Sequence, residues 1–207
     1  MPTIATLFAF TLLNMSLALI PGPDVICIVS NAMVRGRRAG MAVCLGIASA
    51  CLLHVLFATL GLTTMLLATP WVYAGIKLAG ALYLGWLGFG MARAPVATLT
   101  GTGIQQPRSP FAQGALTNLF NPKIALFFLA ILPQFIDPIR GSAAVQSAVL
   151  GLICVGSGTA VNLVTAYTAS RLSARLQAGL SLQHRFQQVS GCVLMVIAAR
   201  LLFCKLG

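Results

Sequence analysis

The first 34 residues carry one charged side chain, and its position constrains the fold more than any other feature of the sequence. Residues 2–34 are otherwise uncharged and apolar enough to lie in a membrane. Asp24 follows Pro21, Gly22 and Pro23 within this stretch. Because a carboxylate inside hydrocarbon is costly, such a residue marks a functional site by default. A helix-capping role at a break in the helix is the alternative interpretation of Asp24.

The composition indicates an all-α integral membrane protein. Hydrophobic residues make up 58% of the chain and charged residues only 7%, against about 25% charged residues in soluble domains. Long apolar runs without two-residue alternation favour helices over a barrel. A net charge of +11 would suggest nucleic acid in a soluble protein. Here the basic residues cluster in short connections, so a nucleic-acid partner is excluded and the lipid bilayer is the expected surroundings.

The apolar runs predict six transmembrane helices. Their expected ranges are 3–34, 40–67, 70–92, 111–136, 143–169 and 186–204. The first run lacks a basic leader and is too long for a signal core, so we expect it to be retained as a span. Residues 94–110 form the one long polar connector. This linker divides the chain into a first three-helix repeat at 1–93 and a second at 111–207.

Basic residues predict the orientation of these helices. The connections after the first, third and fifth spans hold eight of them: Arg35, Arg37, Arg38, Arg93, Arg108, Arg171, Arg175 and Arg185. The opposite side has only Arg140, Arg200 and Lys205. The positive-inside rule therefore predicts a cytoplasmic linker and places both termini outside, in the periplasm. With three spans each, the two halves would cross the bilayer in opposite directions.

Two proline motifs predict breaks in the first and fourth helices. Residues 22–24 (Gly-Pro-Asp) align with residues 121–123 (Asn-Pro-Lys), and each proline precedes a charge. Proline removes a backbone donor and clashes with the preceding turn, so Pro21, Pro23 and Pro122 are the expected breaks. Such paired interruptions indicate the binding site of an inverted-repeat transporter. A plain proline kink in each helix is the alternative.

The two charges beside these breaks are expected at similar depth. Asp24 lies 11 residues from Arg35, about 16 Å along a helix. Lys123 lies 13 residues from Pro110, roughly 20 Å. In a hydrocarbon core about 30 Å thick, both positions fall near the midplane. The exposed N-termini of the half-helices would favour an anion there.

Other polar residues in the spans have two interpretations each. His54 could relay protons or pack against a carbonyl, and Lys77 is expected to reach the membrane interface. Asn118 and Asn121 could bind substrate or satisfy freed backbone groups. Asn14 is as readily explained as a bond between helices.

Small residues predict close helix packing, in particular the pairs Gly36 with Gly40 and Gly46 with Ala50. The six cysteines form no metal-type cluster, so neither a metal nor a structural disulfide is expected. They are Cys27, Cys44, Cys51, Cys154, Cys192 and Cys204. No cofactor is indicated.

Several motifs resemble the lysine exporter (LysE/RhtB) family of amino-acid translocators. They are PGPD at 21–24, GRRAG at 36–40, GIASACLLH at 46–54, GL at 61–62, KLAGALYLGWLG at 77–88, GALTNLFNPKIALFF at 114–128 and LPQF at 132–135. The resemblance implies a bacterial inner-membrane exporter of amino acids or close derivatives, driven by the proton gradient. The sequence departs from the family at Ala50, where we expect glycine, and at Cys51, where a polar residue is common. The identity of the substrate stays open.

A proton-coupled secondary exporter is the leading functional hypothesis. Lys123 and the half-helix ends would hold a substrate carboxylate, and Asp24 would hold the ammonium group or the exchanged proton. The expected substrate site is Asp24, Lys123, Asn121, Asn118 and Gly22, with Asp24 and His54 as proton-coupling residues. Another small-molecule carrier or a channel is the alternative, and a homodimer is left open. No Walker motif is present, so ATP is not the expected energy source. We expect no enzyme, because residues 156–158 (Gly-Ser-Gly) lack a full nucleophile pattern and the chain has only two histidines and two acidic residues.

Overall fold

The structure is a computed structural model that describes residues 1–20, 22–68, 70–93 and 109–171, with positions 188, 192, 195, 196, 198, 199 and 202. Regular structure within these residues is helical, without strands. The predicted all-helical class is therefore confirmed. Pro21 and most of the predicted linker lie outside the described residues. The division into two repeats stays a prediction.

The first predicted span consists of two helices that meet at a sharp bend. Helix α1 (Ile4–Leu19) and helix α2 (Pro23–Val34) are inclined by 58°. Thr3 begins α1, because its side-chain oxygen accepts from the Thr6 N–H at 3.1 Å. Pro23 is the first residue of α2, a position where its missing N–H has no helical partner to lose. Gly22 between them is fully extended.

The fourth predicted span is broken in the same way. It comprises α5 (Pro110–Leu119), α6 (Pro122–Leu126), a π-helical turn η1 (Phe127–Ile131) and a 3-10 turn η2 (Leu132–Phe135). The part before the break and the part after it are inclined by 47°. Pro122 again occupies the first helical position, and the Asn121 side chain caps the new helix. Breaks therefore occur at both Pro23 and Pro122.

Three long helices complete the described bundle. They are α3 (Arg37–Ala68), α4 (Pro70–Arg93) and α7 (Ala143–Arg171), close to the predicted spans. Among the described residues, α3 over Arg37–Gly61 and α7 are long and apolar enough to cross a membrane, and the number rises to four if each bent pair is one span. The predicted sixth span, 186–204, lies largely outside the described residues. The six-span count stays a prediction.

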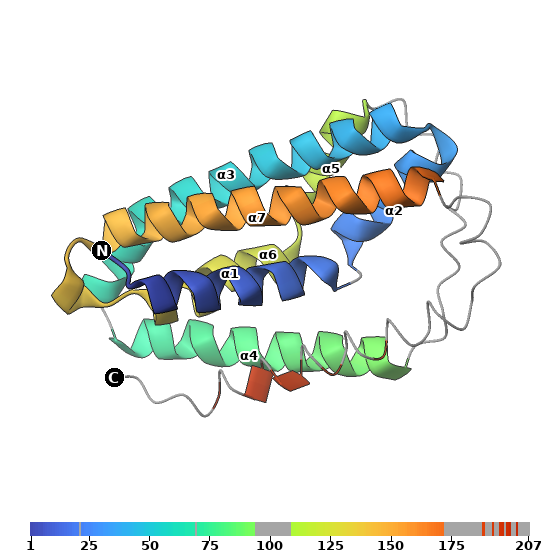
Figure 1. Ribbon diagram of the computed structural model, residues 1–207. Helices are drawn as coiled ribbons and strands as arrows, with labels where there is room; N and C mark the ends of the chain where they lie inside the picture. The colour runs from blue at the N-terminus through green and yellow to red at the C-terminus, as the bar shows by residue number, and fades with distance from the viewer. Residues whose placement is uncertain are drawn as a thin grey trace.

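The two broken helices run antiparallel along each other (Figure 1). The N-terminal ammonium of Met1 donates to the Arg140 carbonyl of the turn η3 (Pro138–Arg140). Further along, Asp24 of α2 contacts Asn118 of α5. Near the far end, Asn31 donates to Gln113 at 3.0 Å. Later residues of the first broken helix thus meet earlier residues of the second.

Most of the described basic residues lie at one end of the bundle. Figure 1 shows the end of α2, the start of α3 and the ends of α4 and α7 at the right. Arg37 and Arg171 stack on the same Tyr167 ring, at 4.9 and 5.2 Å from its centroid. Arg140 lies at the opposite end with Met1. The orientation in the membrane is predicted from this same distribution of basic residues between the two ends of the bundle.

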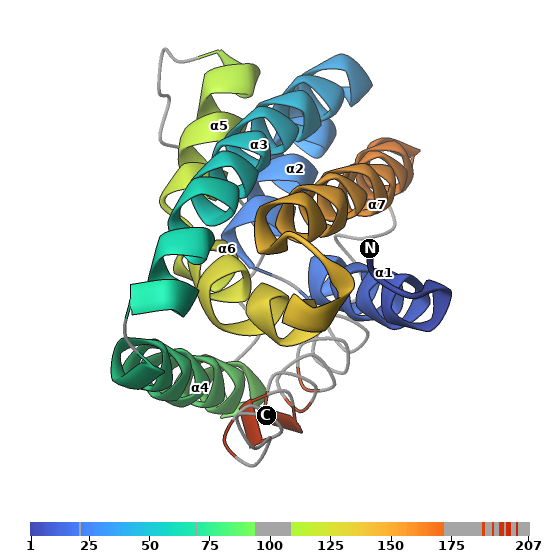
Figure 2. The same ribbon diagram turned by 90° about the vertical axis from the view of Figure 1, so that its left-hand side faces the viewer.

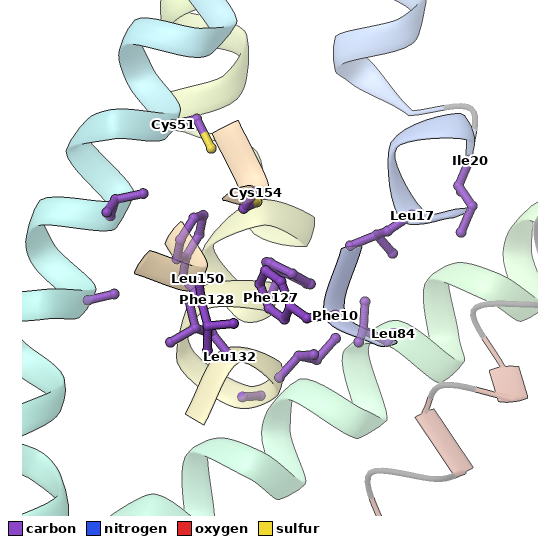
Figure 3. Close-up of a cluster of buried hydrophobic side chains, with 14 of the residues drawn as sticks. Phe10, Leu17, Ile20, Cys51, Leu84, Phe127, Phe128, Leu132, Leu150 and Cys154 are labelled. Carbon is purple, nitrogen blue, oxygen red and sulfur yellow. The ribbon is translucent and has the colours of Figure 1, made fainter. Parts of the chain in front are cut away.

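A cluster of buried aromatic and aliphatic side chains packs between α1, α3, α4, α7 and the second broken helix (Figure 3). Phe10 of α1 is fully buried at its centre, with ring centroids of Phe127 and Phe135 at 5.6 and 5.2 Å. The outer surface is also apolar: Phe57 is 62% exposed and Trp86 69%. Exposed apolar side chains of this size are typical of a lipid-facing surface.

Glycines allow α3 and α5 to touch through their backbones, which confirms the predicted role of Gly46. A Cβ atom at Gly46 would lie 2.0 Å from the Phe111 carbonyl oxygen. One at Gly114 would lie 2.2 Å from the Val43 oxygen. The prediction for Gly40 is also confirmed, because a Cβ atom there would lie 2.7 Å from Ala32 Cβ. The prediction for Gly36 is wrong, because no atom of another described residue beyond its chain neighbours lies within 4 Å of its Cβ position. Its φ of 84° instead serves the turn between α2 and α3.

Candidate functional site

A cavity of about 50 Å³ lies between the two helix breaks. Its walls come from both broken helices, from α3 and from α7, and α6 lies at the centre of the bundle (Figure 2). The polar residues in its lining are Asn14, Asp24, Asn118, Lys123, Thr159 and Asn162, with the thiols of Cys51 and Cys154. A cavity of this volume holds a few water molecules. Asp24 and Lys123, which the sequence places at similar depth, both line this cavity.

Asp24 is held by the other break and keeps one oxygen free. Its side chain is 6% exposed, and Oδ2 accepts from Asn118 Nδ2 at 2.9 Å. Oδ1 is buried and has no hydrogen-bond partner among the described residues. The carboxylate caps no backbone N–H in this structure, so the capping interpretation lacks support. A buried carboxylate oxygen without a donor is costly, and it suits a ligand that supplies one.

Lys123 does not pair with Asp24. Its ammonium donates to the carbonyl oxygens of Leu17 and Ile20, each at 3.3 Å. Both carbonyls lie at the end of α1, where the regular helical hydrogen bonds stop. The Leu17 carbonyl also accepts from the Ile20 N–H at 3.3 Å. In the described part of the chain, the one ion pair joins Asp137 and Arg140 at 3.0 Å. Lys123 therefore completes the end of α1 while lining the cavity, a role that the sequence analysis did not foresee.

Asn118 and Asn121 differ in their position relative to the cavity. Asn118 is 1% exposed, lines the cavity and binds Asp24, and its Oδ1 has no partner in the described chain. Asn121 lies outside the cavity lining, and its Oδ1 accepts from the Lys123 N–H at 3.0 Å. Gly22 also lies outside the lining, and a Cβ there would meet Lys123 Nζ at 3.3 Å. Asn121 and Gly22 therefore support the cavity without bordering it.

His54 lies behind the cavity. Its Nε2 is 3.3 Å from the Asn118 backbone oxygen, and since a carbonyl only accepts, Nε2 carries the proton. The ring stacks on Phe128 with centroids 5.8 Å apart. His54 thus reaches Asp24 only through Asn118. The side chain of Lys77 lies outside what the structure describes.

Three polar residues of the lining were absent from the predicted site. Asn14 donates to the Cys154 carbonyl at 3.0 Å and to Ser157 Oγ at 2.7 Å, which confirms its expected role as a bond between helices. Thr159 and Asn162 of α7 also border the cavity. They carry no charge and follow no proline, so neither signal used for the other residues could identify them. The remaining signal in the sequence is that Thr159 and Asn162 are three positions apart, which places them on one face of α7.

Comparisons with known proteins show which proteins this chain is similar to. The family described as LysE type translocator matches residues 15–204. The homoserine/homoserine lactone efflux protein of Salmonella typhimurium is 30% identical over 198 residues, or 94% of each chain. The threonine efflux protein of Salmonella typhi is 29% identical over 143 residues, covering 66% of this chain and 69% of that protein. An uncharacterized membrane protein of Pseudomonas aeruginosa is 31% identical over 162 residues, covering 74% and 75%. No solved structure matches.

Proposed function

This chain belongs to the LysE type translocator family, and we propose that it is a secondary-active exporter that moves amino acids or close derivatives out of the cytoplasm. The efflux proteins for threonine and for homoserine among its relatives support this class of substrate. Membership of a translocator family also favours transport over catalysis. The observation that carries the proposal is the buried Asp24 carboxylate, which leaves one oxygen free in a cavity at a helix break.

The cavity offers acceptors for a substrate ammonium group. Asp24 Oδ1 and Asn118 Oδ1 are both buried without donors, and both residues line the cavity. An ammonium group has three N–H donors and a positive charge. It would satisfy both oxygens and neutralise the carboxylate, which a neutral ligand would not do.

Lys123 would bind the substrate carboxylate with the donor that remains. Two of its three N–H groups are directed to the carbonyls of Leu17 and Ile20. The third is available at the cavity wall. Because Asp24 and Lys123 do not pair with each other, each can bind the opposite end of a zwitterion.

Asp24 is also the group that would couple transport to protons. The chain has two acidic residues, and the other, Asp137, is 45% exposed and paired with Arg140. If one carboxylate binds either a proton or a substrate ammonium, the two ligands compete. That competition suffices for antiport when the site faces alternate sides of the membrane. His54 would act only indirectly, by holding the Asn118 backbone.

We propose a bacterial inner-membrane location with both termini in the periplasm. Arg35, Arg37, Arg38, Arg93 and Arg171 gather at the end of the bundle opposite Met1, and basic ends remain in the cytoplasm. The antiparallel course of the two broken helices supports an inverted repeat. A reporter fused after Gly207 that is active only in the cytoplasm should stay silent, and a strong signal would overturn this orientation.

Transport by inverted membrane vesicles tests the mechanism. With an acidic lumen, the wild-type protein should accumulate labelled threonine or homoserine against its gradient. Asp24→Asn preserves size and most hydrogen bonding but cannot release a proton. We expect this variant to lose accumulation, while exchange of internal for external substrate can persist.

Asp137→Asn at matched expression is the control, and it should accumulate substrate at the wild-type rate. If Asp24→Asn accumulates as fast as wild type, Asp24 is structural and the coupling proposal is wrong. Non-saturating flux without counterflow would favour a channel over a carrier.

A further inference from the structure

One face of α7 borders the cavity over two helical turns. Val155, Gly158, Thr159 and Asn162 all contribute to the lining. Their spacing of three and four residues places them on the same side of the helix. The segment from Ala143 to Ser170 contains no charged residue. This wall is therefore polar without being ionised.

Asn162 lies at the level of Asp24 in the bundle. Helix α7 runs in the same direction as α1 and α2 (Figure 1). Asn14 of α1 bonds Cys154 and Ser157, before this point in α7. Beyond it, Ala32 of α2 packs with Ala169 in one cluster. Asp24 falls between Asn14 and Ala32, and Asn162 falls between Ser157 and Ala169, so the two residues border the cavity at a similar depth.

The polar groups of Asn162 and Thr159 are free. The Asn162 side chain is 8% exposed, yet its carboxamide makes no hydrogen bond to any described residue. The Thr159 hydroxyl is likewise unpaired in the described chain. On the same helix, Ser157, Thr165, Thr168 and Ser170 all donate to carbonyls of their own helix. Thr159 is partly buried, and both residues line the cavity. Polar side chains without a partner at a cavity wall favour a ligand that completes their hydrogen bonds.

We propose that Asn162 and Thr159 bind the side chain of the transported amino acid and select a short, uncharged side chain that carries a hydroxyl group. This inference rests on the proposed exporter function. With the ammonium group at Asp24 and the carboxylate at Lys123, the side chain of a substrate must leave in a third direction. The α7 wall is the polar surface that remains.

The chemistry of the wall matches a hydroxyl group. A carboxamide and a hydroxyl both donate and accept, so a substrate O–H can satisfy either residue. A cationic side chain would find no counter-charge on α7. An apolar side chain of the same shape would leave both groups unpaired, and a site built around such hydrogen bonds rejects the analogue that lacks the partner.

Threonine and valine provide the test, because they differ only by a hydroxyl in place of a methyl group. Initial uptake of each labelled amino acid would be measured in inverted vesicles and expressed as their ratio, which is independent of expression level. The wild-type ratio should favour threonine by about tenfold or more. Asn162→Leu and Thr159→Val preserve shape and remove the polar groups, so each should lower the ratio to about one to three.

Thr165→Val is the matched control, since the Thr165 hydroxyl bonds the Val161 carbonyl of its own helix away from the cavity. It should retain the wild-type ratio. A wild-type ratio near one would overturn the inference, as would an unchanged ratio in both α7 variants. Loss of uptake of both amino acids by a stable Asn162→Leu protein would also contradict it, because Asn162 would then bind the common part of the substrate.

The outcomes separate this inference from the exporter function. One outcome is that wild type transports amino acids, that Asp24→Asn abolishes accumulation, and that the α7 variants retain the wild-type ratio. In that case only the inference about α7 fails. If wild-type vesicles take up no amino acid at all, the exporter proposal fails and this inference fails with it.

Discussion

The two helix breaks share a proline motif but differ in how their polar groups are satisfied. At the first break, no side chain caps the start of α2, and Gly22 is simply extended. At the second, Asn121 caps the start of α6. Donors of the second break also supply the first: Asn118 binds Asp24, and Lys123 binds the last carbonyls of α1.

This difference indicates that the two breaks have different roles. The second break caps its own new helix and donates to the first break, while Asn118 Oδ1 and Asn121 Nδ2 have no partner among the described residues. The first break receives those bonds and retains a free carboxylate oxygen in the cavity. We therefore expect substitutions at the second break to reduce stability first, and Asp24→Asn at the first to reduce transport first.

Removal of the Lys123 ammonium should give the largest loss of stability. Lys123→Met preserves the stem but removes the ammonium donor that the Leu17 and Ile20 carbonyls share, and it leaves Asp24 without a nearby positive charge. Leaving a buried acceptor unsatisfied costs about 1–3 kcal/mol, and more where a charged group is involved. Thermal unfolding of the purified protein in detergent should show a clearly lower midpoint than for Asp24→Asn. Equal midpoints for Lys123→Met and wild type would contradict a structural role for the second break.

Loss of the α6 cap should have an intermediate effect. Asn121→Ala removes the oxygen that accepts from the Lys123 N–H, and loss of such a cap costs about 1 kcal/mol. Asn121→Ser, which can still cap, is the control and should unfold close to wild type. Since Asn121 lies outside the cavity lining, the KM of the stable Ala variant should stay within a few-fold of wild type. A large rise in KM with unchanged stability would place Asn121 in the substrate site instead.

The smallest effect is expected at Gly22. Its extended backbone suits any residue, with φ of −157°, so Gly22→Ala introduces no backbone strain. The new Cβ would lie 3.3 Å from Lys123 Nζ and displace the ammonium by a few tenths of an ångström. We expect less than about 1 kcal/mol of destabilisation and a modest rise in KM. Gly156→Ala, where the Cβ would contact nothing within 4 Å, is the control. A KM that is identical for both variants would show that the position of the ammonium does not matter.

The sequence alone was enough to determine the class of the protein and the places where its helices break, because both depend on the chemistry of residues that are close along the chain. Apolar runs of membrane length predict helices, because each backbone group must then bond within its own segment. Pro23 and Pro122 interrupt these helices because a proline has no N–H to donate, wherever the helix is packed. The residue content of the site near the breaks follows from the same argument, since Asp24, Asn118 and Lys123 flank the prolines along the chain.

Only the tertiary structure decided which groups those residues bind. The partners of Lys123 are carbonyls more than 100 residues away, whereas the sequence had suggested only a substrate carboxylate for its ammonium. Asn162 and Thr159 border the cavity because α7 passes the first break at their level. Their spacing places them on one face of α7 but does not show what that face contacts. Gly46 and Gly36 occur in similar motifs, yet one meets a backbone carbonyl and the other lies in a turn. Hydrogen bonds and close contacts depend on distances between segments that are far apart in the chain. The residue pattern along one segment does not contain those distances.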